Sequence, residues 1–170
     1  VTTEVPDGEL IFEGAQGALL DRDHGFAPHV TPSRITRAAA VEALAMMGIE
    51  AAAVEVWGVL RAVHTRHGAG PLPSEDAALR AALPEPDNDD VGWAGRFRVG
   101  WFDAVLARYA LGFAGPIDRL AITWVDAVER LAGRSVVTAW EIDGRRVEDL
   151  VGVEAGERTV IARAARPVLA

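Results

Sequence analysis

Two short apolar runs constrain the fold of this chain more than any other feature of its sequence. Residues 54–63 (VEVWGVLRAV) and 120–125 (LAITWV) are apolar and rich in β-branched side chains, and they lack the strict alternation of a strand with one face in water. Such runs are typical of the interior strands of a sheet. Helical stretches separate them, so strands alternate with helices, which indicates an α/β fold. With 170 residues we expect a single domain that spans positions 1–170.

Other segments complete the expected arrangement. Apolar side chains recur at helical spacing from Phe102 to Phe113, before Gly115. Residues 135–142 and 145–150 flank an Asp-Gly dipeptide, which predicts an antiparallel pair near the end of the chain. We further expect a strand at 9–13, a mostly buried Ala-rich helix at 34–47, a loop at 64–73, a short helix capped by Ser74, and core positions for Trp57, Trp101, Trp124 and Trp140.

The composition excludes several kinds of chemistry. The chain has 25 acidic and 17 basic residues, a net charge of -8, and every basic residue is arginine. Without lysine it cannot by itself build a Schiff base or a phosphate-binding loop of the G-x-x-x-x-G-K-[ST] kind. Without cysteine it has neither disulfides nor thiolate zinc sites, which fits a cytoplasmic location. Its acidity argues against nucleic acid or an anionic membrane as partner, and no run approaches the ~20 apolar residues of a membrane span.

Polar clusters in two loops are weaker candidates for a site. The four histidines lack a thiolate or matched carboxylates at zinc-site spacing, so we expect no metal site. Asp21, Arg22 and Asp23 precede His24 and could form an acid/base cluster. A solvated turn, in which the Asp side chains bond to backbone, is the simpler interpretation.

Two arginines form a stronger candidate. Arg96 and Arg98 alternate around Phe97, so in an extended chain both guanidiniums point the same way. Two such planar groups suit a carboxylate or a phosphate. A surface ion pair with the acidic segment 87–90 (DNDD) is an equally good interpretation, and the sequence leaves both open.

Five blocks of sequence together resemble the adenylosuccinate synthetase family. They follow the family's order at nearly its spacing and extend from about residue 9 to about residue 143, whereas the remainder resembles the family loosely. The blocks are FEGAQGALLD with DHG and VTPS (12–33), TRHGAGPLPSE (65–75), GRFR (95–98), GWFD (100–103) and LAITWVD (120–126).

The resemblance implies a fold and a reaction. The fold would be part of an adenylosuccinate-synthetase-like sheet flanked by helices, related to P-loop NTPases. The family joins IMP to L-aspartate with GTP and Mg²⁺ through a 6-phosphoryl-IMP intermediate, a ligase reaction of purine metabolism. By position, Gln16 would hold the IMP, Thr31 would contact its phosphate, and the backbone around His67 would border its ribose.

The resemblance also assigns the second substrate and the nucleotide. Arg96 would bind the aspartate carboxylates and Arg98 would lie at the nucleotide phosphates. Asp126 would accept hydrogen bonds from the guanine edge, and Trp124 could stack on the base or fill its cleft instead.

The chain departs from the family pattern where the chemistry is done. The family's phosphate loop with its catalytic aspartate and lysine, its catalytic histidine and its C-terminal guanine-binding loop have no counterpart in this sequence. The aspartate-binding threonines correspond to Gly92, Trp93 and Ala94, and the guanine-flanking lysine corresponds to Trp124. We therefore expect no catalytic residue and no securely bound cofactor in this chain, and the sequence leaves open whether it is an enzyme.

Three functions remain open at this point. The chain is a short paralogue that needs a second chain to supply the phosphate loop, or a non-catalytic module that binds a purine nucleotide or another protein. The third is a subunit of a different C–N ligation in specialised metabolism. Because a slice of a larger fold exposes apolar faces, we expect a homodimer or a complex with a different partner.

Overall fold

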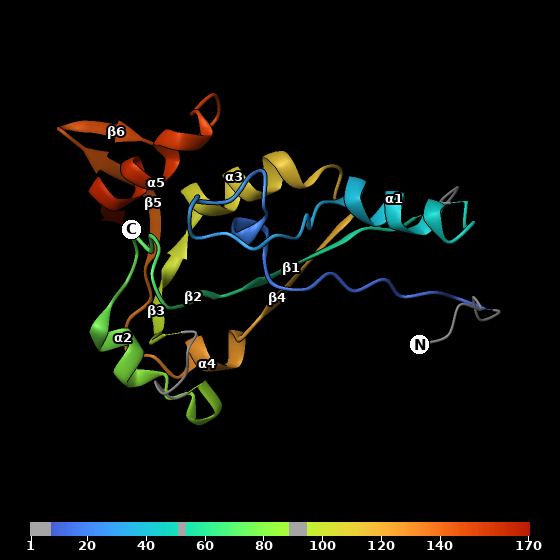
Figure 1. The fold of residues 1–170 in the computed structure, drawn as a ribbon. Helices are drawn as coiled ribbons and strands as arrows, with labels where there is room; N and C mark the ends of the chain where they lie inside the picture. The colour runs from blue at the N-terminus through green and yellow to red at the C-terminus, as the bar shows by residue number, and fades with distance from the viewer. Residues whose placement is uncertain (1–7, 51–53, 89–94) are drawn as a thin grey trace.

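The computed structural model describes residues 8–50, 54–88 and 95–170. A five-stranded sheet with helices against it forms the main body, and a two-stranded sheet extends from that body (Figure 1). The strands are β1 (Trp57–Arg61), β2 (Val63–His67), β3 (Phe97–Asp103), β4 (Arg119–Thr123), β5 (Val136–Ile142), β6 (Arg145–Val147) and β7 (Arg166–Leu169). The α-helices are α1 (Arg37–Met46), α2 (Ala77–Ala82), α3 (Ala104–Ala114), α4 (Val125–Glu129) and α5 (Ala155–Ala164), and short 3-10 turns are η1 (Ala18–Leu20) and η2 (Pro86–Asn88).

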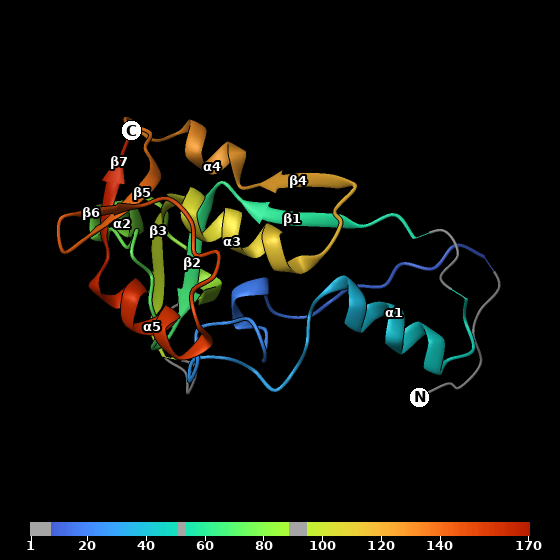
Figure 2. The same ribbon diagram turned by 90° about the horizontal axis from the view of Figure 1, so that it is seen from above.

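The larger sheet has the order β2-β3-β5-β6, with β7 also paired to β5. β3 and β5 run parallel and the other neighbours run antiparallel. α2 and α4 lie on one side of it and α3 and α5 on the other (Figures 1 and 2). The expected α/β class is confirmed, including the antiparallel strand pair β5–β6. Within the described residues no helix is both long and apolar enough to span a bilayer.

Each side of the sheet has its own apolar core. Trp140 of β5 is fully buried beneath α3 and α5, as expected from its apolar run. Its ring nitrogen donates to Asp103 over 2.8 Å, and the other carboxylate oxygen of Asp103 caps α3 by accepting from Val105 and Leu106. On the other side, Phe97 packs among apolar residues of β2, α2 and α4. Burial raises the pKa of Asp103, so the bond from Trp140 compensates a carboxylate that has lost its water.

The two apolar runs form the strands β1 and β4, but these strands are not interior. They pair parallel with each other and with no other strand of the described chain. Trp57 is 57% exposed and Val59 is 67% exposed, so the expected core position of Trp57 is wrong. Leu120 and Ile122 are exposed too, while Trp101 and Trp124 are half-buried. The apolar pattern therefore predicts strands correctly but predicts their burial wrongly, because no described residues cover these side chains.

Several expected boundaries are wrong for local reasons. Residues 9–13 are extended and exposed and form no strand, because nothing pairs with them. The helix expected from residue 34 begins after Thr36, whose hydroxyl caps it, and no residue of α1 is buried. Asp76, not Ser74, caps α2 by accepting from the next turn's backbone N–H groups.

Three strands and a helix were missed or misplaced. Residues 64–67 lie in the expected loop 64–73 but, together with Val63 of the expected strand 54–63, form β2, because β3 supplies a partner for their polar pattern. Phe102 is expected in the following helix and instead belongs to β3. No element is expected beyond residue 150, where the structure has α5 and β7. Residues 89–94, which include Gly92, Trp93 and Ala94, lie outside the described part.

The loop after η1 is fixed by one buried carboxylate. Asp21 is fully buried and accepts from the backbone N–H groups of Asp23, His24 and Ile35 at 2.7–3.0 Å. The interpretation as a turn is therefore right about the backbone bonds but wrong about solvation. Of the two aspartates, Asp23 is the exposed one, and it pairs with Arg22, which is exposed too.

We predict that Asp21→Ala destabilises the chain by about 3 kcal/mol, because it leaves several buried N–H donors without an acceptor. The free energy of unfolding in urea measures this loss. Asp23→Ala, which removes only a surface pair, is the control and should stay within about 0.5 kcal/mol of the unchanged chain. Equal losses for the two variants would contradict the account.

Candidate functional site

A shared carboxylate holds the two arginines that the sequence singled out. Arg96 donates to one oxygen of Glu75 over 3.0 Å, and Arg98 donates to the other over 2.6 and 2.8 Å. The expectation that both guanidiniums point the same way is confirmed by this common partner. The Arg96 side chain is 69% exposed whereas that of Arg98 is 16% exposed. Arg96 is therefore the accessible member of the pair.

Arg66 lies beside Arg98 on the neighbouring strand and faces the same turn. The two residues are in register across β2 and β3. Arg98 donates to the carbonyls of Gly68 and Gly70 at 2.9 and 2.8 Å, and Arg66 donates to that of Ala69 at 3.1 Å. We call residues 68–70 the glycine turn. All three of its carbonyls are held by guanidiniums.

A second loop is joined to this cluster through His29. Arg66 donates to the His29 carbonyl over 3.1 Å, and the guanidinium of Arg163 in α5 contacts the His29 ring nitrogen at 2.7 Å. Loss of water, together with Arg163 and Arg66, lowers the pKa of His29. The neutral ring that results can accept from Arg163. Residues 24–31 are called the Thr31 loop below.

The remaining predicted substrate contacts lie at different distances from the cluster. Thr31, at the end of the Thr31 loop, donates its hydroxyl to the Leu20 carbonyl over 3.1 Å. Gln16 has a left-handed backbone, φ 71°, and an exposed side chain in the segment before η1. No hydrogen bond joins Gln16 to the arginine cluster in the described residues.

The His67 side chain lies away from the arginines. It stacks at a tilt on Phe97, with ring centroids 5.0 Å apart, and contacts Asn88 at 3.2 Å. Successive side chains of a strand point to opposite faces, so Arg66 and His67 are on different sides of β2. The His67 side chain therefore does not face the arginine cluster. The resemblance assigns the ribose contact to the backbone around His67, not to this side chain.

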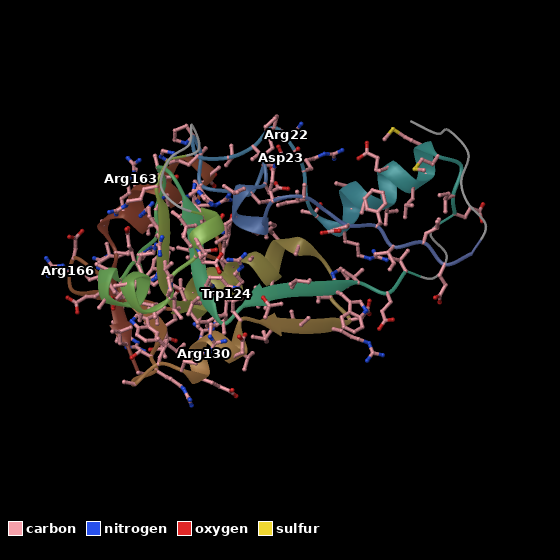
Figure 3. The ribbon with its side chains drawn as sticks, turned by 90° about the horizontal axis from the view of Figure 1, so that it is seen from below. Arg22, Asp23, Trp124, Arg130, Arg163 and Arg166 are labelled. Carbon is pink, nitrogen blue, oxygen red and sulfur yellow. The ribbon has the colours of Figure 1, made fainter. Side chains whose placement is uncertain are left out.

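Trp124 and Asp126 line a separate cavity of about 240 Å³ between α2 and α4. Trp124 has a left-handed backbone, φ 62°, and the guanidinium of Arg61 lies 4.6 Å from its ring centre. Asp126 pairs with Arg130 over 2.7 Å. Figure 3 shows Arg163 and Arg130 on opposite sides of the molecule, with Trp124 between them. None of the cluster arginines, Arg66, Arg96 and Arg98, lines this cavity, so the predicted base contacts and the arginine cluster are two places.

The structure adds residues that the sequence analysis did not name. They are Arg66, Glu75, Asn88 and Arg163. Arg66 and Glu75 stand at the two ends of the block TRHGAGPLPSE, so the motif itself contained the signal. Arg163 had none, because it comes from a helix beyond the recognisable blocks.

The cluster has the charge and geometry that suit an anion. Among the described residues, Arg66, Arg96 and Arg98 bring three positive charges near the carboxylate of Glu75, in a chain whose net charge is -8. Planar guanidiniums bind carboxylates and phosphates in pairs of hydrogen bonds. Nowhere in residues 8–50, 54–88 and 95–170 do three His, Asp or Glu side chains gather as a metal site requires.

Comparison with known proteins identifies the family. The family model described as adenylosuccinate synthetase matches residues 2–163. The chain belongs to the adenylosuccinate synthetase family. Adenylosuccinate synthetases from Synechocystis sp. and Synechococcus sp. are 42% and 40% identical to it over 147 and 143 residues, which is 84% and 82% of the chain. Both matches use 32% of the relative's length.

A solved structure supports the same assignment. The fully ligated adenylosuccinate synthetase from Plasmodium falciparum superposes with a TM-score of 0.73 at 26% identity. It covers 93% of this chain and 37% of its own. The chain thus spans about a third of the length of the adenylosuccinate synthetases that it matches, and shares their fold in that part.

We predict that the ion pairs of Glu75 with Arg96 and Arg98 make the free energy of unfolding fall as the pH becomes acidic. The hydrogen bond from Arg98, then the charges of Arg98 and Arg96, lower the pKa of Glu75. The pair therefore stabilises the fold above the carboxyl's unfolded pKa, and this contribution is lost as pH falls through the lower folded pKa. Urea unfolding between about pH 7 and about pH 3 should show a flatter profile for Glu75→Gln.

Glu129→Gln, on the exposed surface of α4, is the matched control for this profile. This variant should lose as much unfolding free energy between about pH 7 and about pH 3 as the unchanged chain does. Superimposable profiles for Glu75→Gln and the unchanged chain would show that the ion pairs of Glu75 add nothing to stability.

Proposed function

We propose that this chain forms the substrate side of an adenylosuccinate-synthetase-like ligase, which binds IMP and an amino acid donor such as aspartate. The observation that carries the proposal is the gathering of guanidinium charge beside the Thr31 loop, where Arg66 lies next to the two arginines, Arg96 and Arg98, that share the carboxylate of Glu75. Such a gathering suits the phosphate of a nucleotide and the carboxylates of a donor. The chain alone is inactive, because the family's phosphate loop, catalytic aspartate, lysine and histidine are not among its residues.

Arg96 is the contact for the donor's carboxylates. Its side chain is exposed, and Glu75 engages only one of its terminal nitrogens in the bonds described above. Arg98 is already committed to Glu75 and to two carbonyls of the glycine turn. Its role is to add charge and hold the turn, and these bonds leave one N–H of its Nη2 group for a nucleotide phosphate.

Thr31 and Gln16 are the contacts for IMP itself. The Thr31 hydroxyl lies at the end of a loop that Asp21 and Arg66 fix at two points, so it needs little ordering when it meets a phosphate. Gln16 contributes an amide from an exposed, left-handed position. The backbone at His67 borders the ribose.

The cavity beside Trp124 is the place for the guanine of GTP. Asp126 is exposed and acidic, as an acceptor for the base's N–H groups should be, and Arg130 shields it until the base arrives. Trp124 supplies an aromatic ring, one face of which Arg61 covers. GTP and Mg²⁺ would supply phosphoryl transfer in the complete enzyme. The residues of this chain do not include the groups that phosphoryl transfer requires.

A partner chain that carries the family's phosphate-loop segment completes the site. β1 and β4 expose Trp57, Val59, Leu120 and Ile122, and parallel strands are normally covered on both faces. The relatives that this chain matches are about three times as long, which gives the missing layers a source. The complex acts in the cytoplasm, and the chain dimerises through the same exposed surface when its partner is absent.

Two other functions differ from this one in what the chain binds. The first is a non-catalytic module that binds a purine nucleotide. It is favoured if Trp124, which replaces the family's guanine-flanking lysine, fills the guanine cleft with its ring. A different C–N ligation in specialised metabolism is the alternative if a donor other than aspartate binds. Donor titrations with aspartate and other amino acids separate these cases.

We predict that the purified chain binds IMP, and that Arg96→Gln weakens aspartate binding about 10- to 100-fold in the presence of saturating IMP, because a charge-assisted pair of hydrogen bonds is lost. Calorimetry measures both constants. Arg134→Gln, whose guanidinium bonds only a nearby backbone carbonyl, is the control and should leave both unchanged. Absence of any IMP heat, or equal effects of the two variants, would refute the binding role.

We also predict no consumption of IMP, aspartate and GTP by the chain alone, since phosphoryl transfer depends on groups that it lacks. Adding a polypeptide that contains the phosphate-loop segment of an adenylosuccinate synthetase should restore turnover, followed as adenylosuccinate absorbance. Turnover by the isolated chain would contradict the division of labour proposed here.

A further inference from the structure

The side chain of Arg66 joins two loops that lie far apart in the sequence. Its Nε donates to the Ala69 carbonyl of the glycine turn, and a terminal nitrogen donates to the His29 carbonyl of the Thr31 loop, both over 3.1 Å. These acceptors are 3 and 37 residues from Arg66 along the chain. We propose that Arg66 is a positioning residue that couples the Thr31 loop to the glycine turn, so that both meet a nucleotide phosphate as one preformed surface. The nature of this ligand rests on the proposed function.

The glycine turn packs directly on the Arg66 guanidinium. Gly70 has a φ of +119°, and a Cβ at that position would lie 2.3 Å from a terminal nitrogen of Arg66. Only glycine allows both the backbone conformation and this approach. The position of the turn is therefore set by the guanidinium and by the bonds that Arg98 makes to Gly68 and Gly70.

The Thr31 loop depends on Arg66 at one end only. Its first half is held elsewhere: the Tyr109 hydroxyl and Arg158 donate to the His24 carbonyl, and Thr159 donates to the Ala27 carbonyl. At the far half, Arg66 holds the His29 carbonyl, while Arg163 contacts the His29 ring and Thr31 bonds to the Leu20 carbonyl. Loss of Arg66 should thus leave the loop attached at these other points and free the His29 backbone from the glycine turn.

Arg66 has a bridging geometry that lysine cannot reproduce. The guanidinium presents donors in a planar fork, whereas an ammonium is a single point with the same charge. Arg66→Lys therefore separates the charge from the bridge. Arg108 offers a matched control, because its guanidinium also spans two backbone carbonyls, those of Thr138 and Glu148, away from both loops.

The experiment compares the unchanged chain with Arg66→Lys, Arg66→Gln and Arg108→Lys. Amide hydrogen exchange at residues 29–31 and 68–70 reports the coupling without any ligand, and calorimetry with IMP reports its use. We expect Arg66→Lys to accelerate exchange about tenfold in both segments and to weaken IMP binding about tenfold, in line with one or two lost hydrogen bonds. Arg108→Lys should change neither, and the urea midpoint should separate these local effects from general destabilisation.

Each outcome decides a separate part of the proposal. Exchange in Arg66→Lys that matches the unchanged chain, or that rises in only one segment, overturns the coupling. Faster exchange with unaltered IMP affinity overturns its role in ligand binding. If the unchanged chain does not bind IMP, the proposed function fails, whereas the exchange data still judge the coupling. Should Arg66→Gln fail to fold, Arg66→Lys retains the charge and carries the test.

Discussion

The organisation of the site depends on two like charges that lie side by side. Arg66 and Arg98 are in register on adjacent strands and would repel each other, yet backbone carbonyls of the glycine turn and the carboxylate of Glu75 hold both in place. The turn, the Thr31 loop and the exposed Arg96 are all arranged around this pair. Among the described residues one carboxylate lies against three guanidiniums, a balance of charge that favours an anion.

The fold separates this cluster from the exposed strand pair β1–β4. The five-stranded sheet has an apolar core on each side, and the cluster lies on β2 and β3 within that body. β1 and β4 extend from it as a parallel pair with apolar side chains in water (Figure 2). A two-stranded sheet has little stability alone. The arginine cluster therefore lies in the packed body of this chain, and the proposed partner would bind the exposed strand pair.

Sequence reasoning succeeded where one segment determines its own structure. Alternation around Phe97 placed Arg96 and Arg98 on one face, and Asp143-Gly144, with φ of 50° and 74°, closed the expected hairpin. It failed where a distant partner decides. β2 has the polar sequence VHTRH and becomes a strand because β3 lies beside it. Trp57 follows an interior-strand pattern but stays exposed, since no described residues cover it. Helix α5 has only two buried side chains, so its sequence carries a weak apolar signal.

The central claim is that the arginine cluster and the Thr31 loop form one binding surface for a nucleoside monophosphate. Amide chemical shifts of the isotope-labelled chain, followed while IMP is added, test it most directly. The account predicts saturable shifts that begin together at Thr31, at the glycine turn and at Arg96. Shifts that are absent, or that appear only around the separate apolar groove between β6 and α5, which Val147 and Ile161 line, would contradict it.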